Sequence, residues 1–196
     1  GYTPITINDN TLIKDLKCIG ILILSDVIRQ DAKTTLDYFK RQDVDIKIIS
    51  GDDPVTVSAI ARRCHLLNYE HYIDVSSLSD EQIKEAIEKY TIFGRVSPKQ
   101  KQLMVNTLQE NNHTVAMTGD GVNDVLALKA ADCSIAMASG SDAAKSASHI
   151  VLLKNNFNAM PHIVNEGRRV INNITASASM YLIKTIFSVV LSIGMI

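Results

Sequence analysis

The sequence predicts an α/β fold in which helices flank a mostly parallel β-sheet. Three observations predict this class: short apolar runs rich in β-branched residues, stretches of helical periodicity between them, and spacings between the runs that suit βαβ units. The run at residues 18–24 (CIGILIL) is apolar throughout, which is typical of a strand buried on both faces of a parallel sheet. We therefore expect strands and helices to alternate from residue 18 onward.

Local signals mark where several of these elements begin. Pro54 lies at an early helical position, where a proline is tolerated because its missing N–H would have no partner there. Ser79 is a candidate N-cap for the helix that follows it. The strands are predicted at residues 18–24, 44–49, 91–93, 114–117, 133–137 and 150–153, and the helices at residues 30–41, 54–66, 79–90, 98–110 and 122–131.

The last part of the chain, residues 158–196, has the pattern of one long helix. Its first half is polar and contains Arg168 and Arg169, whereas its second half is apolar and contains one charge, Lys184. Two interpretations fit: a buried core helix, or the cytoplasmic end of a transmembrane helix. The two arginines on the polar side agree with the second interpretation, since cytoplasmic flanks of membrane helices are enriched in Arg and Lys.

Composition excludes several functional classes. The 196 residues carry 20 basic and 21 acidic side chains, for a net charge of −1. That balance argues against a nucleic-acid-binding protein, which needs clustered Lys and Arg to neutralise phosphates. The three cysteines, Cys18, Cys64 and Cys133, lie far apart and form no zinc-binding or disulfide pattern, so we expect reduced, buried thiols in a cytosolic compartment.

Candidate functional residues follow the predicted strands, because ligands bind at the carboxyl ends of the strands in such sheets. Residues 118–124 (TGDGVND) place Asp120 and Asp124 after a strand and at the start of a helix. Two carboxylates there are suited to a hard cation such as Mg²⁺. The alternative is that these acidic side chains only cap the helix.

The other strand ends leave similar pairs of interpretations. Ser50, followed by a glycine, is suited to binding a phosphate at a helix start, or is an ordinary cap. Arg95 and Lys101 are suited to neutralising a phosphoryl group, or are solvated surface charges. Asp26 is either a nucleophile or a cap.

Four segments resemble, in order and spacing, the phosphorylation domain of P-type cation-transporting ATPases, within the haloacid dehalogenase-like superfamily with its Rossmann-like fold. They are ISGDDPVTVSAIARRC, FGRVSPKQK, TGDGVNDVLALKAADCSIAM and NEGRRVINNI, and the resemblance is closest to the calcium-pump-like branch. It implies three regions: the tail of a nucleotide-binding domain (1–17), a phosphorylation domain lacking its first strand (18–156), and a stalk helix that continues into a truncated transmembrane helix (157–196).

The resemblance also implies roles for individual residues. Asp120 matches the Mg²⁺ ligand, and Asp124 matches a partner carboxylate that orders the water around the metal and the attacking water. Lys101 matches the lysine that neutralises the phosphoryl oxygens, and Ser50 matches a hydroxyl, usually of threonine, that hydrogen-bonds to them. Further positions that contact ATP or the phosphoryl group in the family are Gly51, Asp52, Arg95 and Asn123.

The implied protein is an integral membrane pump, mostly cytoplasmic in this portion, with Mg²⁺, ATP, a transported cation and the membrane as its cofactors and partners. One departure matters: the Asp-Lys-Thr-Gly-Thr run that carries the phosphorylated aspartate does not occur here, so this chain alone is not expected to form a phosphoenzyme. Asp26 and Arg29 match a hinge motif instead. The alternatives are a soluble haloacid dehalogenase-like phosphatase that uses Asp26, and a regulatory piece without turnover.

Overall fold

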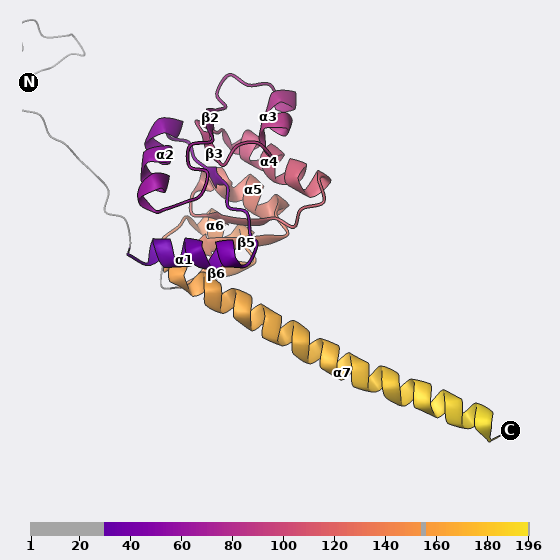
Figure 1. The fold of residues 1–196 in the computed structure, drawn as a ribbon. Helices are drawn as coiled ribbons and strands as arrows, with labels where there is room; N and C mark the ends of the chain where they lie inside the picture. The colour runs from indigo at the N-terminus through magenta and orange to yellow at the C-terminus, as the bar shows by residue number, and fades with distance from the viewer. Residues whose placement is uncertain (1–29, 154–155, 196) are drawn as a thin grey trace, which may run out of the picture.

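The computed structural model describes residues 30–153 and 156–195 and confirms the α/β class (Figure 1). The predicted strand at residues 18–24 lies outside the described residues, as do Asp26 and Arg29. In chain order the elements are α1 (Gln30–Arg41), β1 (Ile48–Ile49), α2 (Pro54–Arg63), β2 (Tyr72–Asp74), α3 (Asp80–Ala86), β3 (Ile92–Gly94), α4 (Pro98–Glu110), β4 (Ala116–Gly119), η1 (Val122–Asp124), α5 (Val125–Ala130), β5 (Cys133–Met137), α6 (Asp142–Ala147), β6 (Ile150–Leu152), η2 (Phe157–Ala159) and α7 (Met160–Gly194).

The described strands form two three-stranded sheets, in the orders β1-β3-β2 and β4-β5-β6, where the sequence led us to expect one. Every strand pair is parallel. The division arises because no described strand joins β1 to β4, so each of these two strands lies at an edge of its sheet. The carboxyl ends of β1 and β4 are the ends that carry Ser50 and Asp120.

Several element boundaries follow the local signals in the sequence. Ser79 accepts a hydrogen bond from the backbone N–H of Gln82, and the Gln82 side chain bonds back to the Ser79 N–H, so the predicted cap is a complete capping box. Pro54 occupies the first turn of α2. The cap of α2 is Asp53, whose side chain accepts from the N–H of Val55.

Other boundaries differ from the predictions. The strand predicted at residues 44–49 is restricted to Ile48–Ile49, and the helix predicted at residues 122–131 begins as the 3₁₀ turn η1. Strand β2 and helix α6 were not predicted. Strand β2 (Tyr-Ile-Asp) lies at the edge of its sheet and has Tyr72 exposed. An edge strand of this kind needs no apolar run, and its sequence contains none.

The core of the described α/β domain lies between the sheets and their helices. Helix α4 contributes to two parts of it: Met104 packs with Ile83 and Phe93, whereas Val105 packs with Leu128. Because α4 also contacts both α3 and α5, it connects the β1-β3-β2 half to the β4-β5-β6 half. That connection brings residues from the two halves to one site.

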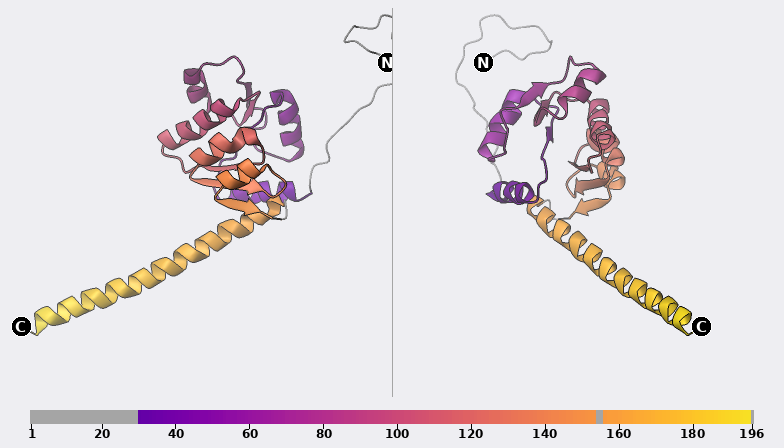
Figure 2. Two further views of the ribbon diagram at one scale, coloured as in Figure 1. Left: turned by 180° about the vertical axis from the view of Figure 1, so that it is seen from behind. Right: turned by 45° about the vertical axis from the view of Figure 1, so that its right-hand side comes forward.

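Helix α7 leaves the domain beside α1 and extends away from it as a single rod (Figure 2). Met160 is buried, and the Tyr38 hydroxyl donates to Asn165 Oδ1 at 3.0 Å. From Asn165 onward the described side chains of α7 are exposed, so the interpretation as a buried core helix is wrong. Within the described residues, this helix with its preceding turn is long and apolar enough to cross a membrane.

Candidate active site

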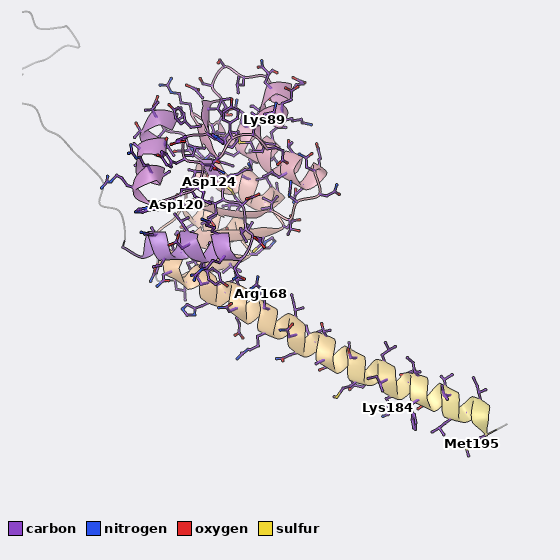
Figure 3. All side chains as sticks on the ribbon, in the orientation of Figure 1. Lys89, Asp120, Asp124, Arg168, Lys184 and Met195 are labelled. Carbon is purple, nitrogen blue, oxygen red and sulfur yellow. The ribbon has the colours of Figure 1, made fainter. Side chains whose placement is uncertain are left out.

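The site predicted from the sequence lies at the carboxyl ends of the parallel strands. Ser50 follows β1, Arg95 follows β3 and Asp120 follows β4, while Lys101 is on the first turns of α4. Figure 3 shows Asp120 and Asp124 together within the α/β domain, far from the C-terminal end of α7. The structure brings Lys101 into contact with Asp124, and it joins the turn that carries Ser50 to the turn that carries Arg95.

Lys101 and Asp124 form a buried ion pair at the centre of this region. Lys101 Nζ lies 2.7 Å from Asp124 Oδ1, and each side chain is only 11% exposed. The second oxygen, Oδ2, accepts a hydrogen bond from the backbone N–H of Gly121 at 3.1 Å. Lys101 is thus not the solvated surface charge that was one interpretation of its position. The pair connects the helix after β3 to the turn after β4, and so connects the two halves of the domain.

Gly119, the last residue of β4, makes room for this carboxylate. A Cβ atom at position 119 would lie 2.6 Å from Asp124 Cβ and 2.9 Å from Asp124 Oδ2. Atoms cannot approach that closely, so any larger residue would displace the Asp124 side chain. At Gly121 the nearest atom to such a Cβ is Asp124 Oδ2 at 3.4 Å, which is close to ordinary contact.

The backbone of Asp120 is held by the loop between β5 and α6. Its carbonyl oxygen accepts a hydrogen bond from the N–H of Ser141 at 2.8 Å. A Cβ atom at Gly140 would lie 2.8 Å from the same oxygen and 3.0 Å from Asp120 Cα. The side chain of Asp120 is exposed, and no hydrogen bond or ion pair to another described residue engages its carboxylate. The loop therefore fixes the backbone and leaves the carboxylate available.

These donors suit Mg²⁺ better than a metal that needs a complete protein cage. Among residues 30–153 and 156–195, no group of three or more His, Cys, Asp or Glu side chains gathers around a metal-sized site. Mg²⁺ keeps several waters and binds through one or two carboxylates plus substrate phosphate oxygens, whereas Ca²⁺ takes six to eight oxygen ligands. Asp120, with Asp124 beside it, matches the first pattern. The assignment of these residues to a metal remains a prediction.

The turn after β1 is shaped by Ser50 and Asp52. The Ser50 hydroxyl accepts from the N–H of Asp52 and donates to Asp52 Oδ2, both at 3.1 Å. Asp53, and not Ser50, caps α2, so the Ser/Asp cap expected at this turn is made by the aspartate. Ser50 closes its own turn with an exposed carboxylate, and a phosphoryl oxygen could take the place of that carboxylate. Gly51 is exposed in this turn, and a Cβ there would meet nothing within 4 Å.

Arg95 lies beside two carboxylates, neither of which was predicted from the sequence as its partner. Its guanidinium lies 2.9 Å from Asp53 Oδ2 and 3.5 Å from Asp74 Oδ2. Its backbone has a φ of 54°, in the left-handed region that a non-glycine residue seldom adopts, and its N–H donates to the carbonyl of Asp52 at 2.8 Å. A backbone held in this conformation by its surroundings is common at functional sites.

Asp74 ends strand β2, which was not predicted. The only feature of the sequence that marks Asp74 is the Asp-Val-Ser turn that it begins, and this turn does not indicate a contact with Arg95. The Ser76 hydroxyl and N–H both donate to Asp74 Oδ1, at 2.7 and 2.9 Å. The pKa of Asp74 is lowered below its usual value. The largest cause is the hydrogen bond from the Ser76 hydroxyl, followed by the hydrogen bond from the Ser76 N–H and by the nearby charge of Arg95. One oxygen of Asp74 thus faces its own turn and the other faces Arg95. Asn123 is exposed on η1.

The hollows of the described surface do not all coincide with this site. A mainly apolar hollow of about 240 Å³ reaches Ser50 and Asp52. A larger one of about 520 Å³ lies at the opposite, amino-terminal ends of β1 and β3, around Lys47 and Glu88. Burial lowers the pKa of Lys47, and its ammonium donates to the carbonyl of Tyr90 at 3.0 Å. This larger hollow contains none of the predicted site residues.

Comparison with known proteins identifies the family. Residues 5–132 match the family model described as haloacid dehalogenase-like hydrolase. The chain belongs to that family. Its curated relatives include the probable cation-transporting ATPase exp7 of Streptococcus pneumoniae, which is 50% identical over 179 residues, and the calcium-transporting ATPase CtpE of Mycobacterium tuberculosis, which is 49% identical over 177 residues. The matches cover 91% and 89% of this chain but only 23% and 22% of those proteins.

Comparison with solved structures gives the same result. A zinc-transporting PIB-type ATPase in the E2.Pi state matches with a TM-score of 0.62 and 27% identity over 78% of this chain and 21% of that one. The catalytic domain of the CPx-ATPase CopB-B matches with a TM-score of 0.56 and 28% identity over 71% of this chain and 46% of that one. The resemblance to P-type cation-transporting ATPases is confirmed. This haloacid dehalogenase-like chain spans less than a quarter of the length of the curated relatives it matches.

Proposed function

We propose that this chain is part of an ATP-driven P-type pump. In the intact pump, phosphoryl transfer from ATP to an aspartate, and hydrolysis of the resulting acyl phosphate, would drive a cation across a membrane. The observation that carries the proposal is the buried Lys101–Asp124 pair beside the available carboxylate of Asp120. Relatives named as cation-transporting or calcium-transporting ATPases at 49–50% identity support it.

The charges at the site suit transfer of a phosphoryl group. Such a reaction needs positioning and positive charge more than covalent help from the protein. When bound, Mg²⁺ supplies positive charge against the phosphoryl oxygens. Asp120 would hold the metal, and Asp124 would orient water around it. Lys101, kept in place by Asp124 at 2.7 Å, would direct its ammonium at the same oxygens. Its effect would be increased because the Lys101 side chain is itself largely shielded from solvent.

The residues around β1 and β3 would hold the phosphate side of ATP. Ser50 would turn its hydroxyl from Asp52 to a phosphoryl oxygen. Arg95 is about half exposed beside its two carboxylates, and its guanidinium would turn from them to a phosphate oxygen of the nucleotide. Gly51 would let the nucleotide approach the backbone, and Asn123 is exposed where it could donate a hydrogen bond.

The regions of the chain follow from this function. Residues 1–17 would end a nucleotide-binding domain, residues 18–156 would form most of the phosphorylation domain, and residues 157–196 would form a stalk that enters the membrane. The protein would be an integral membrane protein with this part mostly in the cytoplasm. The apolar character of α7 and its exposed surface support the membrane assignment.

Acid-stable labelling by γ-labelled ATP tests the proposal. In an intact transporter containing this sequence, we expect label on an aspartate outside the chain, sensitive to chelation of Mg²⁺ and lost in Asp120→Ala. Labelling that persists in Asp120→Ala with the same Mg²⁺ dependence would contradict the metal role. Phosphatase turnover by the chain itself, abolished by Asp26→Asn, would contradict the pump and favour a soluble phosphatase.

A further inference from the structure

Lys184 is the single charge in the apolar half of α7. Residues 175–194 contain no other Asp, Glu, Lys or Arg, and the helix is continuous from Met160 to Gly194. No hydrogen bond or ion pair joins the Lys184 ammonium to another residue that the structure describes. Figure 3 shows Lys184 well along the rod, far from the α/β domain. Its partner must therefore come from elsewhere if the helix enters a bilayer.

The position of Lys184 along the helix sets its depth. A helix rises about 1.5 Å per residue, so crossing a hydrocarbon core of about 30 Å takes about 20 residues. A span of that length that begins at Thr175 would place Lys184 at its middle. From Arg169 to Lys184 the rise is about 22 Å. The four-carbon stem of a lysine is too short to return the ammonium from the midplane to either surface.

The polar residues near Lys184 lie on one face of α7. Successive spacings of four, three, four and four residues align side chains along a helix. Thr185 borders this face, and its hydroxyl is bonded to the carbonyl of Tyr181 at 2.9 Å. The residues at these spacings, which we call the polar stripe, are Ser177, Tyr181, Lys184, Ser188 and Ser192.

The polar stripe differs from the rest of the helix surface in what it can contact. Large aliphatic and aromatic side chains cover the remaining surface between residues 180 and 194, and they are compatible with lipid tails. The Ser192 hydroxyl is satisfied by the carbonyl of Ser188 at 2.9 Å. The Lys184 ammonium has no such hydrogen bond to the backbone of its own helix. A charge at the bilayer centre is costly unless it is paired or faces the interior of a helix bundle.

We propose that the polar stripe of α7 packs against another membrane-spanning helix of the same protein, and that this helix places a carboxylate opposite Lys184. The inference rests on the proposed function for the membrane location of α7. Charge complementarity selects the occupant, since a carboxylate is the group that compensates an ammonium at this depth. The pair would fix the rotation of α7 about its own axis.

A zero-length cross-link tests this pairing in the intact transporter in its membrane. Dicyclohexylcarbodiimide condenses the Lys184 amine with a touching carboxylate to an amide, and the water removed converts the carbodiimide to its urea. We expect mass spectrometry to find a peptide that joins Lys184 to an Asp or Glu of another apolar helix. Lys184→Gln should lose this peptide. The matched control Lys184→Gln/Ile186→Lys moves the amine about 200° around the helix, and should also fail to form it.

The opposite results would overturn the inference. Three results would show that no carboxylate faces Lys184, as for a lysine that faces lipid or a water-filled cavity. They are a cross-link from Ile186→Lys as strong as that from Lys184, a link to a residue outside the membrane, and the absence of any Lys184 link. Phosphoenzyme formation is measured on the same membranes. Normal labelling without the cross-link refutes the pairing alone, whereas absent labelling in the parent refutes the proposed function.

Discussion

Removing the ammonium of the Lys101–Asp124 pair should strongly destabilise the α/β domain. Lys101→Met keeps most of the apolar stem but leaves Asp124 Oδ1 without its partner at 2.7 Å, in a position where only 11% of the side chain is exposed. Breaking a buried pair by removing one partner costs about 3–5 kcal/mol. Since the pair is slightly exposed and Oδ2 keeps the N–H of Gly121, we expect the lower end, about 3 kcal/mol.

Thermal unfolding of the purified chain in mild detergent, followed by circular dichroism, measures this cost. For a domain of this size, about 3 kcal/mol lowers the midpoint by about 10 °C. The double variant Lys101→Met/Asp124→Leu should recover most of the loss, because two apolar side chains leave no unpaired charge.

The Lys84–Glu110 pair provides the matched control. Its atoms are 3.4 Å apart and its side chains are 45% and 63% exposed, so Lys84→Met should cost no more than about 0.5 kcal/mol. Equal midpoints for Lys84→Met and Lys101→Met would refute the reasoning. So would a double variant at positions 101 and 124 that is as unstable as the single one.

Two further predictions concern the loops around the site. Gly140→Ala places a methyl group 2.8 Å from the carbonyl oxygen of Asp120, so it should raise the Mg²⁺ concentration needed for phosphoenzyme formation. Gly167→Ala is the control, because its methyl group would meet nothing within 4 Å, and it should leave that concentration unchanged. Equal Mg²⁺ dependence of the two variants would disprove the role of the loop. Ser76→Ala removes the main cause of the lowered pKa of Asp74, and carboxyl NMR titration should show that pKa rising. Because the folded pKa is lowered, the contribution of Asp74 to stability is present above its unfolded pKa of about 3.9 and is lost as the pH falls through the folded value; the variant should lose it at a higher pH, and an unmoved titration would contradict this cause.

Elements with strong local signals could be predicted from the sequence. The bounds of α1, α4 and β5 match the predicted residues 30–41, 98–110 and 133–137, because helical periodicity, a Ser-Pro start and a short, mainly apolar run are each determined locally. The bounds of β1 could not be predicted, since residues 44–47 (VDIK) alternate apolar and charged side chains as a strand would, but pair with no described strand. Pairing depends on distant segments rather than on local composition.

Candidate site residues could be proposed from the sequence, but their contacts could not be predicted. The strand-end rule brought Asp120 and Lys101 to one region, yet the ion pair of Lys101 with Asp124 depends on how α4 packs on α5. The carboxylates that hold Arg95 were not predicted as its partners, because one of them, Asp74, comes from a strand with no apolar run. Long-range contacts of this kind are set by tertiary packing.

The Mg²⁺ dependence of phosphoenzyme formation in the intact transporter tests the central claim most directly. The comparison is between Asp120→Asn, which removes one negative charge without changing side-chain size, and Glu110→Gln, an equivalent change at the far end of α4. We expect that Asp120→Asn needs a much higher Mg²⁺ concentration or forms no phosphoenzyme, while Glu110→Gln behaves as the parent. Overlapping Mg²⁺ curves for Asp120→Asn and the parent would contradict the claim that this chain provides the metal site of a P-type pump.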